Sequence, residues 1–185
     1  RRRTRGIDLI GYLRGSLGLG ESARILARAL ETSEVEHSFV AIPTPLGRDT
    51  LDAGVPLTSG FPHAVTVLHV NPTEVEGFAR AFGEDAFGGR KLVGLWYWEL
   101  EEIPLEWRAM SLVFDEVWVA SEWLRGALAP QLHCPVHAFP FPLDAIGTPP
   151  PPADGELALA IPEDRYVFLT LFDHHSGFER KNPEG

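Results

Sequence analysis

The sequence has one cysteine, no long apolar run and few basic residues, and each shortage excludes a class of protein. Cys134 is the only cysteine in 185 residues, so an internal disulfide framework and a multi-cysteine metal site are excluded. A reducing, cytoplasmic setting is the default for such a chain. No stretch of about 18 apolar residues could form a transmembrane helix. With a net charge of −10, and basic residues clustered only at positions 1–5, the chain is not expected to bind nucleic acid.

The composition is that of a globular domain with a substantial core. Hydrophobic residues make up 44% of the chain, and there are five tryptophans. The length suits one full domain with part of a second. The chain opens with Arg-Arg-Arg-Thr-Arg, without an initiator methionine or an apolar signal segment. We therefore expect it to be a piece of a longer protein.

Apolar runs and amphipathic segments alternate along the chain. Strands are predicted at residues 7–12, 36–42, 64–70, 92–98, 116–120 and 136–139, and helices at 21–30, 73–82, 105–112 and 122–128. This order predicts an α/β, Rossmann-like, doubly wound parallel sheet with flanking helices. Ligands of such sheets bind beyond the carboxyl ends of the strands. The aperiodic segment 43–62 is long for a loop, which is typical of a functional or mobile segment.

A glycine-rich segment, Gly15-Ser-Leu-Gly-Leu-Gly20, separates the first strand from the first helix. Glycines such as Gly18 and Gly20 let a ligand approach the backbone, and the helix that follows offers unpaired N–H groups to an anion. The alternative is a turn that only packs the helix closely onto the sheet. Glu21 at the helix start would also repel a phosphate.

The same segment fits the Gly-x-Gly-x-x-Ala pattern of dinucleotide-binding oxidoreductases, from Gly18 to Ala23. Two features argue against that function. The glycines lie several residues beyond the strand instead of directly after it. Pro43 and Thr44 follow the second strand, where an acidic residue would hold the ribose.

Polar and aromatic residues follow the predicted strands, at the edge where ligands are expected. They are His69 and Asn71 at the close of the third strand, Trp96, Trp98 and Glu99 at the end of the fourth, and Ser121 after the fifth. Aromatic faces stack on the C–H surfaces of sugars, and the polar groups bond hydroxyls. Structural alternatives remain: a hydrogen-bonded histidine, tryptophans in the core, and a serine that only caps a helix.

The chain changes character after the sixth predicted strand. We assign residues 1–142 to a first domain, the proline-rich residues 143–161 to a linker and residues 162–185 to the start of a second domain. The strand predicted at 166–172 precedes a loop with Arg180 and Lys181, a pair suited to a diphosphate. Asp173, His174 and His175 are too close in sequence to converge on an ion, so no metal is predicted.

Five segments together resemble the group 1 type retaining glycosyltransferases of the GT-B fold, which has two Rossmann domains. They are Gly15-Ser-Leu-Gly-Leu-Gly-Glu-Ser-Ala-Arg-Ile-Leu-Ala-Arg-Ala-Leu30, His69-Val-Asn71, Gly94-Leu-Trp-Tyr-Trp-Glu-Leu100, Glu116-Val-Trp-Val-Ala-Ser121 and Phe178-Glu-Arg-Lys-Asn-Pro183. The resemblance covers the acceptor-side N-terminal domain and the first strand of the donor-side domain.

The resemblance implies transfer of a sugar from a nucleotide-diphosphate-sugar to a glycan or lipid-linked acceptor in polysaccharide or cell-envelope biosynthesis. It implies no cofactor beyond that substrate, and a cytoplasmic protein that can contact the inner membrane face. It assigns catalytic roles to Glu99 and His69, the donor diphosphate to Gly18, Gly20, Arg180 and Lys181, and the acceptor to Asn71, Trp96, Trp98 and Ser121. Without the rest of the donor domain, the chain alone is expected to be inactive.

The sequence also departs from that family. Asp173 and His174 replace the usual Gly-Arg pair after the donor-domain strand, and Phe139-Pro-Phe-Pro142 replaces an Asn-Gly turn. Two alternatives therefore stay open. One is a non-catalytic domain that binds carbohydrate or nucleotide, and the other is the NAD-dependent oxidoreductase.

Overall fold

The computed structural model describes residues 3–45, 47–83 and 86–143, with the isolated positions 164, 166 and 168. The chain divides into two units, Arg1–Thr148 and Pro149–Gly185, and the elements below belong to the first. The predicted linker beyond residue 143 and the basic loop with Arg180 and Lys181 lie outside the described residues.

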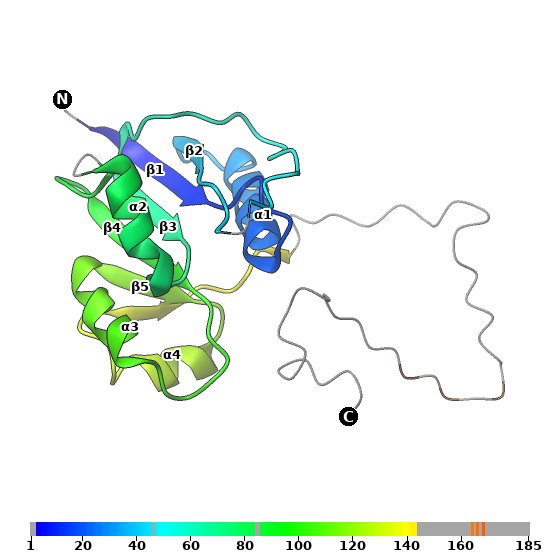
Figure 1. Ribbon diagram of the computed structural model, residues 1–185, viewed down its shortest axis with the longest axis vertical. Coiled ribbons are helices and arrows are strands. Elements are labelled where there is room, and N and C mark those ends of the chain that lie inside the picture. Colours follow the sequence, from blue (N-terminus) through cyan, green and yellow to red (C-terminus); the bar gives the residue numbers. More distant parts are fainter. Residues whose placement is uncertain are drawn as a thin grey trace. The chain divides into compact units, whose positions relative to one another are not determined.

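Six parallel strands form the sheet of the first unit (Figure 1). They are β1 (Thr4–Gly11), β2 (His37–Ala41), β3 (His63–His69), β4 (Lys91–Trp96), β5 (Glu116–Val119) and β6 (Val136–Ala138), in the order β2-β1-β3-β4-β5-β6. Every pair of neighbouring strands is parallel. The prediction of an α/β, Rossmann-like sheet is confirmed.

Helices cover both faces of the sheet, as a doubly wound fold requires (Figure 1). The elements are α1 (Gly18–Glu31), η1 (Pro72–Glu74), α2 (Val75–Phe82), α3 (Leu105–Met110), η3 (Ser111–Val113) and α4 (Glu122–Leu128). Helix α1 packs on one face, where Leu26 meets strand residues such as Leu9 and Val67. Helices α2, α3 and α4 pack on the other face through Phe78, Trp107 and Leu128 respectively.

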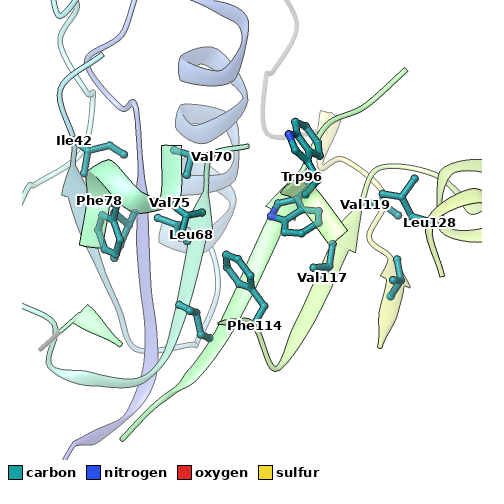
Figure 2. Close-up of a cluster of buried hydrophobic side chains, with 14 of the residues drawn as sticks. Ile42, Leu68, Val70, Val75, Phe78, Trp96, Phe114, Val117, Val119 and Leu128 are labelled. Carbon is teal, nitrogen blue, oxygen red and sulfur yellow. The ribbon is translucent and has the colours of Figure 1, made fainter. Parts of the chain in front are cut away.

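The larger hydrophobic cluster lies on the face covered by α2, α3 and α4 (Figure 2). Trp96 is fully buried in it and meets the rings of Trp107 and Phe114 edge to face, at centroid distances of 5.9 and 5.5 Å. Strand alternation explains the two clusters, because successive β1 residues Leu9 and Ile10 enter opposite ones. This packing fixes the sheet whose carboxyl edge is described below.

A buried polar rung crosses the sheet nearer its amino edge. Asp8 of β1 is in register with Ser38 of β2 and Thr66 of β3, and its carboxylate accepts a 2.7 Å hydrogen bond from the Ser38 hydroxyl. Arg90 donates to Asp8 and to Thr66, both at 2.8 Å. Asp8 and the Arg90 side chain are almost completely buried, so each needs the other as a partner.

Within the described residues, no helix is both long and apolar enough to cross a bilayer.

Candidate functional site at the carboxyl edge of the sheet

The order of the strands creates a switch point at the carboxyl ends of β1 and β3. From β1 the chain passes to β2 on one side, and β3 then pairs with the other side of β1. Gly11 and His69, the last residues of β1 and β3, lie opposite one another. Parallel sheets bind ligands at such a point, so this edge is the candidate site.

Three side chains from separate elements form a hydrogen-bonded chain there. The Ser22 hydroxyl of α1 lies 2.7 Å from Nε2 of His69 and 2.6 Å from the hydroxyl of Tyr97, which follows β4. The His69 and Tyr97 rings also pack together, with centroids 5.5 Å apart. We call Ser22, His69 and Tyr97 the switch-point cluster.

His69 is a core residue of this cluster with no exposed surface. Burial lowers its pKa to about 4, so the imidazole is neutral near pH 7. Its Nε2 meets Ser22, whereas its Nδ1 is buried without a hydrogen-bond partner. A ligand at this edge could therefore reach His69 only through Ser22 or Tyr97, and not by direct contact.

Asn71 and Tyr97 link the ends of β3 and β4. The side-chain oxygen of Asn71 accepts a 3.1 Å hydrogen bond from the backbone N–H of Tyr97, and it makes no capping hydrogen bond to the short helix that follows. Burial raises the pKa of the Tyr97 phenol, which keeps it protonated as a hydrogen-bond donor. Both residues are half-buried, within reach of solvent.

The predicted aromatic acceptor contacts divide between core and rim. Trp96 presents no ring face to a ligand because its side chain is completely buried, which corrects the expectation of an acceptor contact there (Figure 2). Trp98 is half-buried beyond the end of β4, packs on Trp107 at 4.7 Å and donates its indole N–H to the Glu102 carbonyl at 2.7 Å. Glu99 follows it and is exposed.

Ser121 has the structural role that the sequence left open. Its hydroxyl accepts a 3.2 Å hydrogen bond from the N–H of Leu124, which makes it the N-cap of α4. The side chain is exposed at the end of β5. It is not among the hydrogen-bond partners of the switch-point cluster.

The predicted glycine turn is partly helical, because α1 begins at Gly18. A Cβ at Gly20 would collide with the Gly15 carbonyl oxygen and lie 2.8 Å from that of Tyr12, whereas one at Gly18 would meet nothing within 4 Å. Gly20 therefore permits close packing of α1, and Gly18 lies exposed at its start. The N–H groups of Gly18 and Gly20 precede the first bond of the helix, from Glu21 N–H to the Leu17 carbonyl.

Two arginines offset the negative charge of Glu21 at the start of α1. Arg24 donates to it at 2.7 and 3.0 Å, and Arg28 at 3.2 Å. The hydrogen bonds from Arg24 in particular hold the pKa of Glu21 below its ordinary value. Arg24 also donates to the carbonyls of Leu13 and Gly15, fastening the loop after β1 to the helix. The repulsion expected between Glu21 and an anion is therefore weakened.

Nothing in the part of the chain that the structure describes gathers three His, Cys, Asp or Glu side chains into a metal site.

The Gly-x-Gly-x-x-Ala pattern does not lie where a dinucleotide-binding turn would need it. β1 ends at Gly11, and the first glycine of the pattern, Gly18, already belongs to the helix. The tight glycine turn that a dinucleotide needs directly after the strand is missing from this position.

No pattern in the sequence indicated Ser22 or Tyr97 as site residues. Tyr97 lay inside a motif already noted, between Trp96 and Trp98, and strand alternation would have placed it on the opposite face from them. Ser22 carried no signal, because its contact with His69 depends on how α1 is rotated over the sheet.

Taken together, the edge offers hydroxyl donors and acceptors, one half-buried indole, a neutral histidine behind them and an exposed carboxylate. Such groups suit a ligand rich in hydroxyls. Comparisons of the chain with protein-family models, with curated proteins and with solved structures find no match.

Proposed function

We propose that this domain is the acceptor-side half of a retaining glycosyltransferase of the GT-B type. The observation that carries the proposal is the common location of four segments behind the family resemblance. One follows β1 and three include the carboxyl ends of β3, β4 and β5, and in a parallel sheet these ends meet at one edge. The fifth segment, with Arg180 and Lys181, lies outside the described residues.

The residues at this edge divide the work of holding an acceptor. Tyr97 and Ser22 exchange hydrogen bonds with sugar hydroxyls, and the Glu99 carboxylate accepts one at the rim. Trp98 supplies a partly exposed aromatic surface to the apolar face of a sugar ring. His69 fixes the Ser22 hydroxyl from behind, through the 2.7 Å contact. Neutral imidazole suits this task because it can accept a hydrogen bond from the serine hydroxyl without placing a charge in the core.

The start of α1 is suited to the leaving group. Retaining transfer passes through an oxocarbenium-like state, in which negative charge develops on the departing diphosphate. The unpaired N–H groups of Gly18 and Gly20 and the positive end of the helix dipole stabilise such charge. The ion pairs of Glu21 with Arg24 and Arg28 keep its carboxylate from opposing that effect.

A titration of the isotope-labelled 185-residue chain with neutral disaccharides tests the acceptor site. We expect the amide signals of Asn71 and Tyr97 and the indole signal of Trp98 to shift, while the indole of buried Trp96 does not. Glu99→Gln should weaken binding by about fivefold, because a neutral amide oxygen accepts a weaker hydrogen bond than a carboxylate does. The matched control is Glu106→Gln, another exposed glutamate, on α3. Equal affinities of the two variants would contradict the assignment.

A non-catalytic carbohydrate-binding domain is the second candidate, and the burial of His69 favours it. A histidine with no exposed surface cannot itself exchange a proton with a substrate. This candidate predicts the same disaccharide shifts but no release of nucleoside diphosphate from the complete product of the reading frame. Glycosyl transfer predicts both.

A further inference from the structure

A cavity of about 320 Å³ lies at the carboxyl end of β2, apart from the switch-point cluster. Its lining includes the apolar residues Ala41, Ile42, Pro43 and Leu57 and the charged residue Arg14. Its volume is at the lower end of the range for small-molecule sites. None of these residues takes part in the site proposed above.

The walls of the cavity are two loops joined by backbone hydrogen bonds. The loop after β1 and the segment 43–62 exchange a 2.9 Å bond from Ser16 N–H to the Arg48 carbonyl and a 3.1 Å bond from Leu51 N–H to the Arg14 carbonyl. Gly15 permits this approach, since a Cβ there would lie 2.7 Å from the methyl carbon of Thr44. The segment expected to be functional or mobile is thus anchored beside β1.

The far side of the cavity is fixed to the sheet. Leu57 forms a parallel bridge with Phe39 of β2, and the N–H of Thr58 donates to the Phe39 carbonyl at 2.8 Å. Leu57 also packs against the hydrophobic cluster under α1. The apolar walls are therefore positioned before any ligand arrives, which lowers the entropic cost of binding.

Two charged side chains, Arg14 and Asp49, line the cavity, and Asp49 accepts hydrogen bonds from within its own loop. Both Asp49 carboxylate oxygens accept hydrogen bonds from the Thr44 N–H, at 3.0 and 3.1 Å, so Asp49 serves the turn of its own loop. Arg14 is exposed, and its guanidinium makes no ion pair or side-chain hydrogen bond with any residue that the structure describes. In a chain of net charge −10, this cation at an apolar cavity is unusual.

We propose that the cavity binds a small molecule that carries a carboxylate or phosphate on an apolar body. The Arg14 guanidinium pairs with the anionic group, for which its planar set of donors is suited. Ile42 and Leu57 remove the apolar body from water. The proposal rests on the cavity alone, so its outcome is independent of glycosyl transfer.

Titrations of the isotope-labelled 185-residue chain with benzoate and with phenyl phosphate test this site. We expect saturable shifts of the Ala41, Ile42 and Leu57 amides and of the Arg14 side-chain N–H, with tighter binding of one probe identifying the preferred anion. Benzyl alcohol, which matches the apolar body without the charge, should bind about tenfold more weakly.

Two variants decide whether Arg14 and the cavity are responsible. Arg14→Gln should weaken binding of the better anion about tenfold, while Arg125→Gln, an exposed arginine on α4, should leave it unchanged. Ala41→Leu should fill part of the cavity and weaken binding of both probes while Arg14 stays in place. The absence of saturable shifts at these amides up to about 10 mM probe, or equal affinity in wild type and Arg14→Gln, would overturn the proposal.

Discussion

Lowering the pH should destabilise the fold through His69, and replacing this residue should remove that part of the loss. The imidazole is fully buried, and burial lowers its pKa from 6.5 to about 4. Below its unfolded pKa, the unfolded chain gains a proton that the folded chain does not accept. The contribution of His69 to stability is therefore fully present above 6.5 and is lost as the pH falls from 6.5 to about 4. Integrated from about pH 7.5 to about pH 5, the loss is about 2 kcal/mol.

Urea unfolding at these two pH values measures the effect in wild type, His69→Gln and His133→Gln. Each protein serves as its own reference, so a general destabilisation by the substitution cancels. We expect wild type and His133→Gln, which loses only an exposed imidazole, to lose about 2 kcal/mol more than His69→Gln. An equal loss in all three proteins would refute the placement of a neutral His69 in the core.

Five further substitutions test the packing of the domain by urea unfolding at neutral pH. Gly20→Ala should cost about 2 kcal/mol or more because its Cβ meets backbone carbonyls, while Gly18→Ala should be neutral or stabilising; equal effects would contradict the assigned packing. Ser121→Ala should cost about 1 kcal/mol as a lost cap, and no loss would remove that role. Arg90→Met should cost about 3–5 kcal/mol by stranding Asp8, and the added Asp8→Asn change should recover part of it; a cost below about 1 kcal/mol would show that the pair is solvated.

The sheet could be predicted because local pattern and global fold agree. Short apolar runs alternate with amphipathic segments, and such alternation has few solutions other than a parallel sheet covered on both faces. Helix α1 starts at Gly18, earlier than predicted. Gly18 and Gly20 lie in its first turn, where the backbone N–H groups need no helical partner. The glycines were interpreted as a loop, although they belong to the packed start of the helix.

The site was harder to predict because its contacts join residues that are distant in sequence. Alternation places Trp96 and Trp98 on the same side of a strand and cannot tell which is buried. Trp96 lies within β4 beneath Trp107, whereas Trp98 follows the end of the strand and remains at the rim. The contact of Ser22 with His69 depends on the register of β1 and β3 and on the rotation of α1, neither of which is encoded by any local motif.

Turnover of nucleotide sugars by the complete product of the reading frame is the most direct test of glycosyl transfer. The purified protein would be incubated with a panel of nucleotide-diphosphate-sugars and with glycan or lipid-linked acceptors, and the released nucleoside diphosphate would be measured. We expect release from one donor, increased by an acceptor and reduced in Tyr97→Phe, which loses the hydroxyl that contacts Ser22. A folded protein that binds disaccharides at the carboxyl edge but releases no nucleoside diphosphate would contradict transfer and favour the binding domain.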